Sequence, residues 1–486
     1  MKRRLANPGL SPAVLALLLL VLGRRAGAQS LAALESRPLV LGLEAAVRLA
    51  LEASPSLEGA EAALEAADAR RDAASRLRLP SVLASAAYSH AGPVEPGVLD
   101  VGPQKVALPE ALQDSTSFRL ALQQPLYTGG RLASGLAQAE AGRAAALAEA
   151  AARRRDVAAA AERAWWGLVL ASESEAAVAE NLLAVRSHRA DAERRLAEGT
   201  ATKSELLSWR MQEVEASVRA RSADADRAAA RARLNVLLGR PWDAPLEAAE
   251  EPTMAADGSA VEPTRAAAES AGAAAAAAAA APEGEASRPD GGAGESGLLA
   301  TALGSRPELA AARARVEARE AAVGVARSAL LPALHLTASA AYADPNPKAF
   351  PQRPGFELLW DIGLVASLDL GRLPFARSQV EEARAQAREA RGALAQAQDG
   401  VALELALAGL ELEKARDRLE SSSAAVALAE ENRRVQEERF AAGIALASEL
   451  ADAESALLLA RLDGTRSRVA WELARAALRD AAGGTR

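Results

Sequence analysis

The sequence predicts a mainly α-helical fold with a small β part, in which long antiparallel helices accompany four β-strands per chain. Three observations predict this fold. The chain contains a tandem repeat, since residues 43–239 and 300–482 carry the same features in the same order. Each copy contains two segments of about ten residues in which apolar and polar side chains alternate, which is typical of strands. Each copy ends in a very long helical run that a single glycine interrupts, at Gly199 and at Gly443. A tandem repeat of this kind predicts a pseudo-symmetric structure.

Composition agrees with elongated helices rather than with a set of globular domains. A length of 486 residues would ordinarily suggest about three domains. Only 3% of the residues are aromatic, and alanine dominates the helical segments. Large globular cores need bulky side chains to fill their volume, whereas alanine-rich surfaces suit helices that pack closely.

Several functional classes are excluded by residues that are missing or scattered. The chain has no cysteine, and its three histidines, His90, His188 and His335, lie far apart without ligand spacing. We therefore expect no disulfide, no metal site and no cofactor. No nucleophile–base pairing or phosphate-binding glycine loop is present, so we expect no enzyme.

The amino terminus has the features of a secretory signal peptide, predicted at residues 1–28. A basic start at Lys2–Arg4 precedes an apolar run at Ala13–Leu22 and small residues at 26–28. The apolar run is too short to span a bilayer as a helix. Removing the five basic residues of this segment shifts the formal net charge from −7 to −12. Such an acidic chain is not expected to bind nucleic acid.

The remaining chain divides into an N-terminal extension at 29–42, a first repeat at 43–240, a low-complexity linker at 241–299 and a second repeat at 300–482. In the first repeat we expect a helix at 43–79, strands at 81–90 and 116–126, and helices of about 68 and 38 residues from Arg131. In the second repeat we expect a helix that ends at Leu331, strands at 334–342 and 361–370, and helices at 373–442 and 444–481. Proline-rich loops join the strands of each pair.

Four strands of this kind cannot stand alone in a membrane. Their length matches a tilted strand that crosses a bilayer, and open sheet edges are not tolerated in lipid. Closure into a barrel therefore requires more than one chain. Two chains would give eight strands, which side chains fill, and three would give twelve, which leave a lumen. The sequence by itself leaves the number of subunits open.

Four short stretches resemble the TolC-type outer-membrane efflux channel family, and the likeness covers nearly the whole mature chain. They are the strand-to-helix junction at 123–131, the helix-turn-helix tips at 195–202 and 438–445, and the repeat ending at 237–241. The second junction, at 368–372, departs from the family pattern. The resemblance implies a homotrimer with a 12-stranded barrel in outer-membrane lipid and a long antiparallel helical tunnel in the periplasm. It also implies docking on a periplasmic adaptor and on an inner-membrane pump, driven by protons or by ATP, with passive conduction to the exterior.

The helical tips are the first candidate site. Glycine permits the positive φ that a reversing chain needs, so both glycines would serve as helix caps in any case. The resemblance adds a small surface on which an adaptor hairpin packs. That surface comprises Gly199, Thr200 and Ala201 with Gly443, Ile444 and Ala445.

Acidic residues follow each tip, and mixed charges precede it. These acids are Glu205 after the first tip, and Glu449 and Asp452 after the second, where the family carries acidic residues at the tunnel entrance. Symmetry would turn such acids into rings that favour cations. A solvated helix face would explain them equally well, because 25% of the chain is charged. The residues before the tips could latch the closed tunnel mouth, although surface ion pairs contribute little stability. These are Asp191, Glu193, Arg194 and Arg195 before the first tip, and Glu437, Glu438 and Arg439 before the second.

Aromatic residues are few enough to interpret singly. Trp165 and Trp166, in mid-helix, are expected to pack the tunnel wall rather than to bind a ligand. Trp360 and Tyr342 flank strands and could belong to an interfacial aromatic girdle.

Two alternatives of other classes remain open: a secreted coiled-coil scaffold without a pore, and a periplasmic adaptor. A scaffold has no use for four alternating strands, and an adaptor carries one hairpin flanked by compact β domains. The transported cargo and the identity of the pump are not contained in the sequence.

Overall fold

The computed structural model describes residues 39–92, 98–102, 104–107, 112–249, 292–349 and 353–484. The predicted signal peptide and most of the predicted linker lie outside these residues. The chain divides into two compact units. The helical unit comprises Met1–Pro55, Arg154–Leu303 and Ala402–Arg486, and the sheet unit comprises Ser56–Arg153 and Gly304–Val401. Both long helices, α4 (Arg131–Ala197) and α9 (Leu373–Ala441), contribute residues to each unit.

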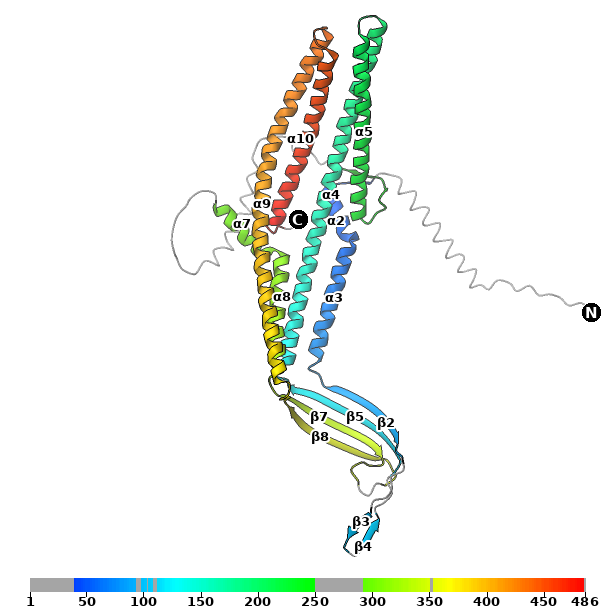
Figure 1. Ribbon diagram of the computed structural model, residues 1–486, viewed down its shortest axis with the longest axis vertical. Helices are drawn as coiled ribbons and strands as arrows, with labels where there is room; N and C mark the ends of the chain where they lie inside the picture. Colours follow the sequence, from blue (N-terminus) through cyan, green and yellow to red (C-terminus); the bar gives the residue numbers. More distant parts are fainter. Residues whose placement is uncertain are drawn as a thin grey trace, which may run out of the picture. The chain divides into compact units, whose positions relative to one another are not determined.

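The helical unit contains two helical hairpins, which Figure 1 shows as the pairs α4/α5 and α9/α10. Its further elements are β1 (Leu39–Leu41), α2 (Leu43–Ala53), α5 (Lys203–Leu237), β6 (Leu246–Ala248), α7 (Gly292–Ser305) and α10 (Ala447–Ala481). The hairpins follow from the sequence, because Gly199 and Gly443 interrupt runs that otherwise contain good helix formers. Among the described helices, none combines the length with the apolar composition that a transmembrane helix needs.

The core of the helical unit lies where α4 passes α2 and the β1–β6 pair. Trp165, Leu168 and Leu234 are fully buried there, together with Leu246. Strand β1 pairs with β6 in parallel, which joins the start of the first repeat to its end. The sequence does not predict this pairing, because two three-residue strands far apart in the chain give no periodic signal.

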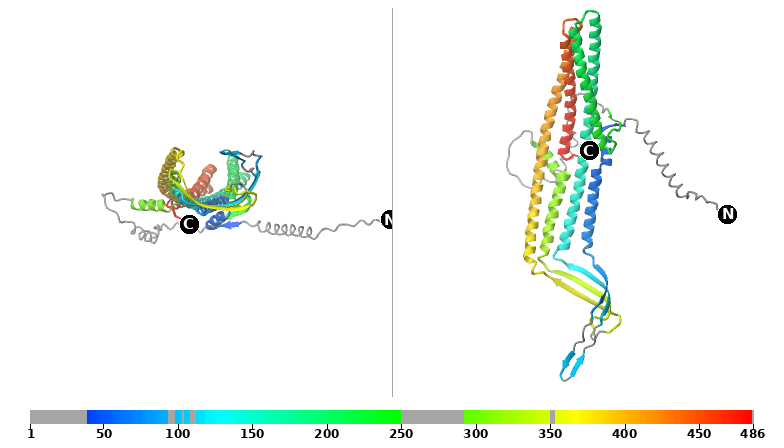
Figure 2. Two further views of the ribbon diagram at one scale, coloured as in Figure 1. Left: turned by 90° about the horizontal axis from the view of Figure 1, so that it is seen from below. Right: turned by 45° about the vertical axis from the view of Figure 1, so that its right-hand side comes forward.

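The sheet unit contains a four-stranded antiparallel sheet in the order β2-β5-β7-β8. The strands lie side by side in one curved sheet (Figure 2). The elements of this unit are α3 (Pro55–Arg76), β2 (Ser81–His90), β3 (Val98–Val101), β4 (Gln104–Ala107), β5 (Asp114–Tyr127), α8 (Pro307–Ser328), β7 (Ala333–Asp344) and β8 (Glu357–Ser367). The fold is thus mainly α with a small β part, as predicted.

The two faces of this sheet differ in chemistry, because directly paired residues share a face. One row across the sheet runs Ala84, Leu120, Ala340 and Trp360, and the next runs Ala86, Phe118, Tyr342 and Leu358. The opposite face carries polar residues that include Gln123, Thr337, Ser339 and Asp361. The alternation predicted from the sequence therefore produces one apolar and one polar face. The large side chains of the apolar face are exposed in the single chain.

Proline corrects two helix predictions. The helix expected at 43–79 is wrong as one element, since α2 ends at Ala53 and α3 begins at Pro55. Proline lacks the N–H that a helix interior needs, and Ser54 before it is extended. The second repeat breaks in the same way between α7 and α8, at Arg306 and Pro307.

Two strand predictions also need correction. The fourth strand, expected at 361–370, is β8 at Glu357–Ser367, so it begins earlier and ends before Asp369 and Gly371. The loop between β2 and β5 is not purely irregular, because it contains the β3–β4 hairpin, which reverses around Gly102 with φ of 65°. Trp360 and Tyr342 lie within β8 and β7 rather than beside them, on the apolar face. Their girdle role stays a prediction.

Candidate functional site: the two helical tips

The same backbone motif closes both tips. Gly199 has φ of 78° and Gly443 has φ of 73°. The N–H that follows each glycine reaches back to the helix: Thr200 N–H donates to the Arg195 carbonyl at 2.8 Å, and Ile444 N–H donates to the Arg439 carbonyl at 2.9 Å. These are Schellman caps, which satisfy carbonyls that the helix end would leave unpaired. The predicted cap function of both glycines is confirmed by this geometry.

Beyond the backbone the two tips differ. Thr202 caps α5, because its hydroxyl accepts from the Glu205 N–H at 3.2 Å. Leu446, at the start of α10, provides no side-chain cap. Both tips expose a side chain at the residue after the glycine, but Ile444, which is 72% exposed, is apolar and Thr200 is polar. Ala201 and Ala445 are half-buried beneath their turns. The first tip is thus polar and the second is apolar.

The helical unit brings the two tips together. One buried cluster contains residues from both hairpins, with Trp209 almost fully enclosed and Leu450 fully enclosed. Its other buried members are Val185, Ala192, Leu206, Ala216, Ala447 and Ala451. The partly buried Phe440, just before the second tip, packs against this cluster. Motion of one tip relative to the other must therefore disturb an apolar contact.

The three predicted acids lie in different environments. Glu205 is half-buried, and its carboxylate lies 3.5 Å from Arg195. Glu449 and Asp452 are exposed on one face of α10. Neither of these two has an ion pair within the described part of the chain.

Of the predicted latch residues, only Arg195 connects the two hairpins. Its guanidinium carbon lies 5.1 Å from the centre of the Phe440 ring of α9, in addition to the Glu205 contact within its own hairpin. The other charges find partners close by in sequence or in their own hairpin: Arg194 pairs with Asp191, Arg210 with Glu193, Arg433 with Glu437, Arg434 with Glu438, and Arg439 donates to Gln436. Among the described residues, Arg195 is thus the one predicted latch residue with a contact between the two hairpins.

Sequence reasoning missed a buried polar cluster below the tips. His188 stacks on Trp209 with ring centres 4.7 Å apart, and its Nε2 lies 3.5 Å from Glu454. Arg433 lies 3.5 Å from the same carboxylate, which is 7% exposed. Burial by itself would raise the pKa of Glu454, but His188 and Arg433 outweigh it and hold the pKa below its ordinary value. His188 precedes Gly199 by as many residues as Glu454 follows Gly443. This equal spacing from the two tips is the sequence signal that would have placed the two side chains at the same level.

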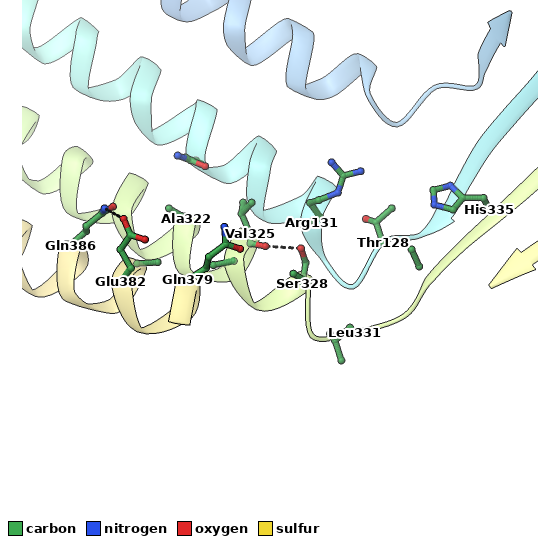
Figure 3. Close-up of a pocket in the computed structure, with 15 residues that line it drawn as sticks. Thr128, Arg131, Ala322, Val325, Ser328, Leu331, His335, Gln379, Glu382 and Gln386 are labelled. Atoms are coloured by element: carbon green, nitrogen blue, oxygen red, sulfur yellow. Dashed lines mark hydrogen bonds between the residues drawn. The ribbon is translucent and has the colours of Figure 1, made fainter. Parts of the chain in front are cut away.

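The strand-to-helix junction of the first repeat is a second built feature, in the sheet unit. Gly129 and Gly130 both have positive φ, of 61° and 85°. A pocket of about 570 Å³ adjoins them, lined by polar residues that include Thr128, Arg131 and His335 (Figure 3). Ser328 at its rim donates a hydrogen bond to the Val325 carbonyl at 2.6 Å. Within the described residues no group of three potential metal ligands occurs, here or elsewhere.

Comparison with known proteins agrees with this architecture. The model of the family described as outer membrane efflux protein matches residues 46–240 and 298–484, one match for each repeat. No match is found among curated proteins.

Solved structures of outer-membrane proteins share the fold. The outer membrane protein VceC from Vibrio cholerae is 21% identical with a TM-score of 0.70, over 91% of this chain and 96% of that one. The outer membrane channel CmeC from Campylobacter jejuni is 17% identical with a TM-score of 0.73, over 91% and 85%. The MtrE outer membrane channel from Neisseria gonorrhoeae, solved in an open state, is 19% identical with a TM-score of 0.67, over 91% and 89%. The chain therefore belongs to the outer membrane efflux protein family, and it is an outer-membrane protein.

Proposed function

We propose that the protein is the outer-membrane duct of a tripartite efflux or type I secretion system. The sheet with one apolar and one polar face carries this proposal. Its edge strands, β2 and β8, have no further partner within the described residues, so the sheet is incomplete in one chain. Three copies would close it into a 12-stranded barrel, with the exposed apolar face toward lipid and the polar face toward a lumen.

The energy for transport then comes from partners, because the duct itself conducts passively and is not an enzyme. An inner-membrane pump, driven by protons or by ATP, supplies the cargo through a periplasmic adaptor. The adaptor docks at the tips, whose backbone turns present Gly199, Thr200 and Ala201 on one hairpin and Gly443, Ile444 and Ala445 on the other. Glycine and alanine leave room for a helical hairpin to approach closely, which supports this assignment.

Glu449 and Asp452 of the assembled chains form the acidic ring of the tunnel entrance. Glu205 joins this ring when its contact with Arg195 is broken. Purified protein in planar bilayers is expected to form cation-selective channels, because rings of carboxylates attract cations. The double variant Glu449→Gln, Asp452→Asn should lose most of this selectivity while still inserting. Asp463→Asn is the matched control, since that acid pairs with Arg418 at 2.7 Å. Insertion without channels, or a protein extracted without detergent, would contradict the duct and favour the scaffold without a pore.

Arg195 is the residue that we expect to latch the closed tunnel mouth. Arg195→Ala removes both the Glu205 contact and the Phe440 ring contact, so channels should open more often. The neighbouring Arg194→Ala removes only the pair with Asp191 on its own helix, and little change is expected. Single-channel recordings of both variants at one salt concentration test this. Equal open probability in the two variants and the parent protein would refute the latch.

A further inference from the structure

The buried polar cluster below the tips places a histidine between the two hairpins. His188 of α4 stacks on Trp209 of its own hairpin, and its Nε2 faces Glu454 of the other hairpin. Trp209 is 1% exposed and the side chain of Glu454 is 7% exposed, so both contacts are largely removed from water. The charge of His188 therefore acts directly on the contact between the hairpins.

Glu454 depends on cations for its place in this contact, because a carboxylate removed from water costs free energy unless opposite charges compensate it. Its Oε1 atom is buried and accepts no hydrogen bond, and it lies 3.5 Å from both His188 Nε2 and Arg433 Nη1. Arg433 also donates to Glu437 at 3.1 Å, so two acids share its charge. The charge of His188 thus decides how well Glu454 is compensated.

Four helices contribute to this cluster, and the other charged side chains around the histidine are already paired. Glu213 of α5 contacts Arg186 and Arg189 of α4, and Glu437 of α9 contacts Arg433. Arginine and ordinary carboxyl groups keep their charges between about pH 5.5 and 8, whereas histidine ordinarily changes its charge there. An indole face and a carboxylate both attract a cation, so imidazolium interacts more strongly than imidazole with the two neighbours of this histidine.

Among the described residues, the histidine–carboxylate contact lies closer to the tips than the other ion pairs between α4 and α10. Toward the base of the hairpins, the same two helices are joined by Glu180 with Arg461 and by Glu173 with Arg468. Arginine stays charged near neutral pH, so these pairs do not respond there. A change of pH therefore acts on the tip end of the α4–α10 contact and leaves its base tied.

The internal repeat carries this cluster only once. The offset that brings Gly199 onto Gly443 also brings the histidine onto Asn432 and Arg210 onto Glu454. An amide has no charge to lose, and a guanidinium stays charged in proteins. The counterpart positions of the other repeat are therefore insensitive to pH near neutrality.

We propose that His188 makes the contact between the two hairpins depend on pH: its protonated ring holds α4 to Glu454 of α10, and its deprotonation loosens the tip end of the hairpins. Acidification then keeps the tunnel mouth closed, and a rise of pH lets it open. The effect on opening rests on the proposed function, whereas the effect on the hairpin contact does not.

The sign follows from the charges of the two groups. Burial raises the pKa of Glu454, but His188 and Arg433 outweigh it and hold this pKa below its ordinary value. The carboxylate is therefore charged throughout the range from about pH 5.5 to 8, and protonation of the histidine adds an attraction to it. Proton binding and closure are then coupled, and such couplings ordinarily amount to a factor of roughly five or more.

Single-channel recordings between about pH 5.5 and 8 test the effect on opening. The open probability of the parent protein should rise by a factor of roughly five or more over this range. His188→Gln cannot titrate and should be similarly open throughout, whereas His188→Lys keeps a positive charge and should stay closed at the upper end. His90→Gln is the matched control, because His90 also contacts an acid, Asp114, but belongs to the sheet unit. Its response should equal that of the parent protein.

Thiol labelling measures the hairpin contact itself, without conduction. The chain has no cysteine, so Ala451→Cys introduces a single thiol into the buried cluster between the hairpins, where Ala451 is 4% exposed. Its rate of reaction with a maleimide is compared with and without His188→Gln at each pH, because the ratio cancels the titration of the thiol. The protein that retains His188 should react roughly fivefold more slowly at the acid end and at nearly the same rate at the alkaline end.

The two measurements separate this inference from the proposed function. Labelling that depends on pH through His188, in a protein that forms no channels, would support the hairpin contact and contradict the duct. Channels with the same pH response in the parent protein and in His188→Gln would overturn the inference and leave the duct standing. Faster labelling at acid pH in the protein that retains His188 would also overturn it, because the sign would be reversed. If His188→Gln fails to fold, Glu454→Gln provides the same test, since it removes the acid that the histidine contacts.

Discussion

Gly129→Ala is expected to cost roughly 2–5 kcal/mol in the stability of the sheet unit, from overpacking together with an unfavourable positive φ. A Cβ at this position would lie 2.8 Å from the Ser328 carbonyl oxygen and 2.9 Å from the Leu331 Cβ. The backbone of Ser328 cannot move aside as a flexible side-chain end could. The expected result is a lower thermal midpoint of the detergent-solubilised protein and less protein in the outer membrane.

Gly130→Ala is the matched control for this prediction. Gly130 also has positive φ, but a Cβ there would meet nothing within 4 Å. Only the backbone term remains, about 1–2 kcal/mol. The difference between the two variants therefore measures the close approach of the strand-to-helix junction to α8. Equal midpoints for the two variants would show that this approach is absent in the assembled protein.

Trp165→Ala is expected to cost about 3–5 kcal/mol in the stability of the helical unit, the usual range for deleting a buried tryptophan. Trp165 is 1% exposed, and its ring meets Trp166 edge-on with centres 4.9 Å apart. Its indole N–H donates to the Leu41 carbonyl at 3.0 Å, which ties β1 to α4. Its assignment as a packing residue agrees with this burial, and no ligand is needed to explain it.

Two further variants divide the Trp165 effect into parts. Trp165→Phe keeps most of the ring and removes one of two hydrogen bonds to the Leu41 carbonyl, which still accepts from the Ala249 N–H at 2.9 Å. The expected cost is therefore about 0.5–1.5 kcal/mol. Trp242→Ala, at a position that is 68% exposed, should change stability by no more than about 0.5 kcal/mol. Thermal unfolding of the four proteins in one detergent gives the order. A midpoint for Trp165→Ala as high as that for Trp242→Ala would contradict the buried role.

The elements that the sequence predicts best are those whose signal lies in neighbouring residues. The alternation at 81–90 gives β2 with its observed bounds, and the glycines locate both tips, because each signal needs only neighbouring residues. Pro55 and Pro307 carried a local signal as well, and helices broken there should have been expected. The predicted fourth strand extends beyond the observed one because the alternation of side chains continues through Leu370, whereas strand pairing stops at Ser367.

Long-range contacts could not be predicted in the same way. His188, Arg433 and Glu454 come from three different helices, and their meeting depends on how two hairpins pack. The role of Arg195 as the cross-hairpin residue depends equally on Phe440, which lies on the other repeat.

The unlike chemistry of the two tips has a consequence for stoichiometry. Their backbones are nearly interchangeable, but Thr200 and Thr202 stand where the second tip has Ile444 and Leu446. In a ring of three chains, six tips would alternate between a polar and an apolar kind. A partner whose binding depends on the side chains of the tips would meet a surface with threefold rather than sixfold symmetry. It would bind as three copies, or as six copies in two alternating and chemically distinct modes.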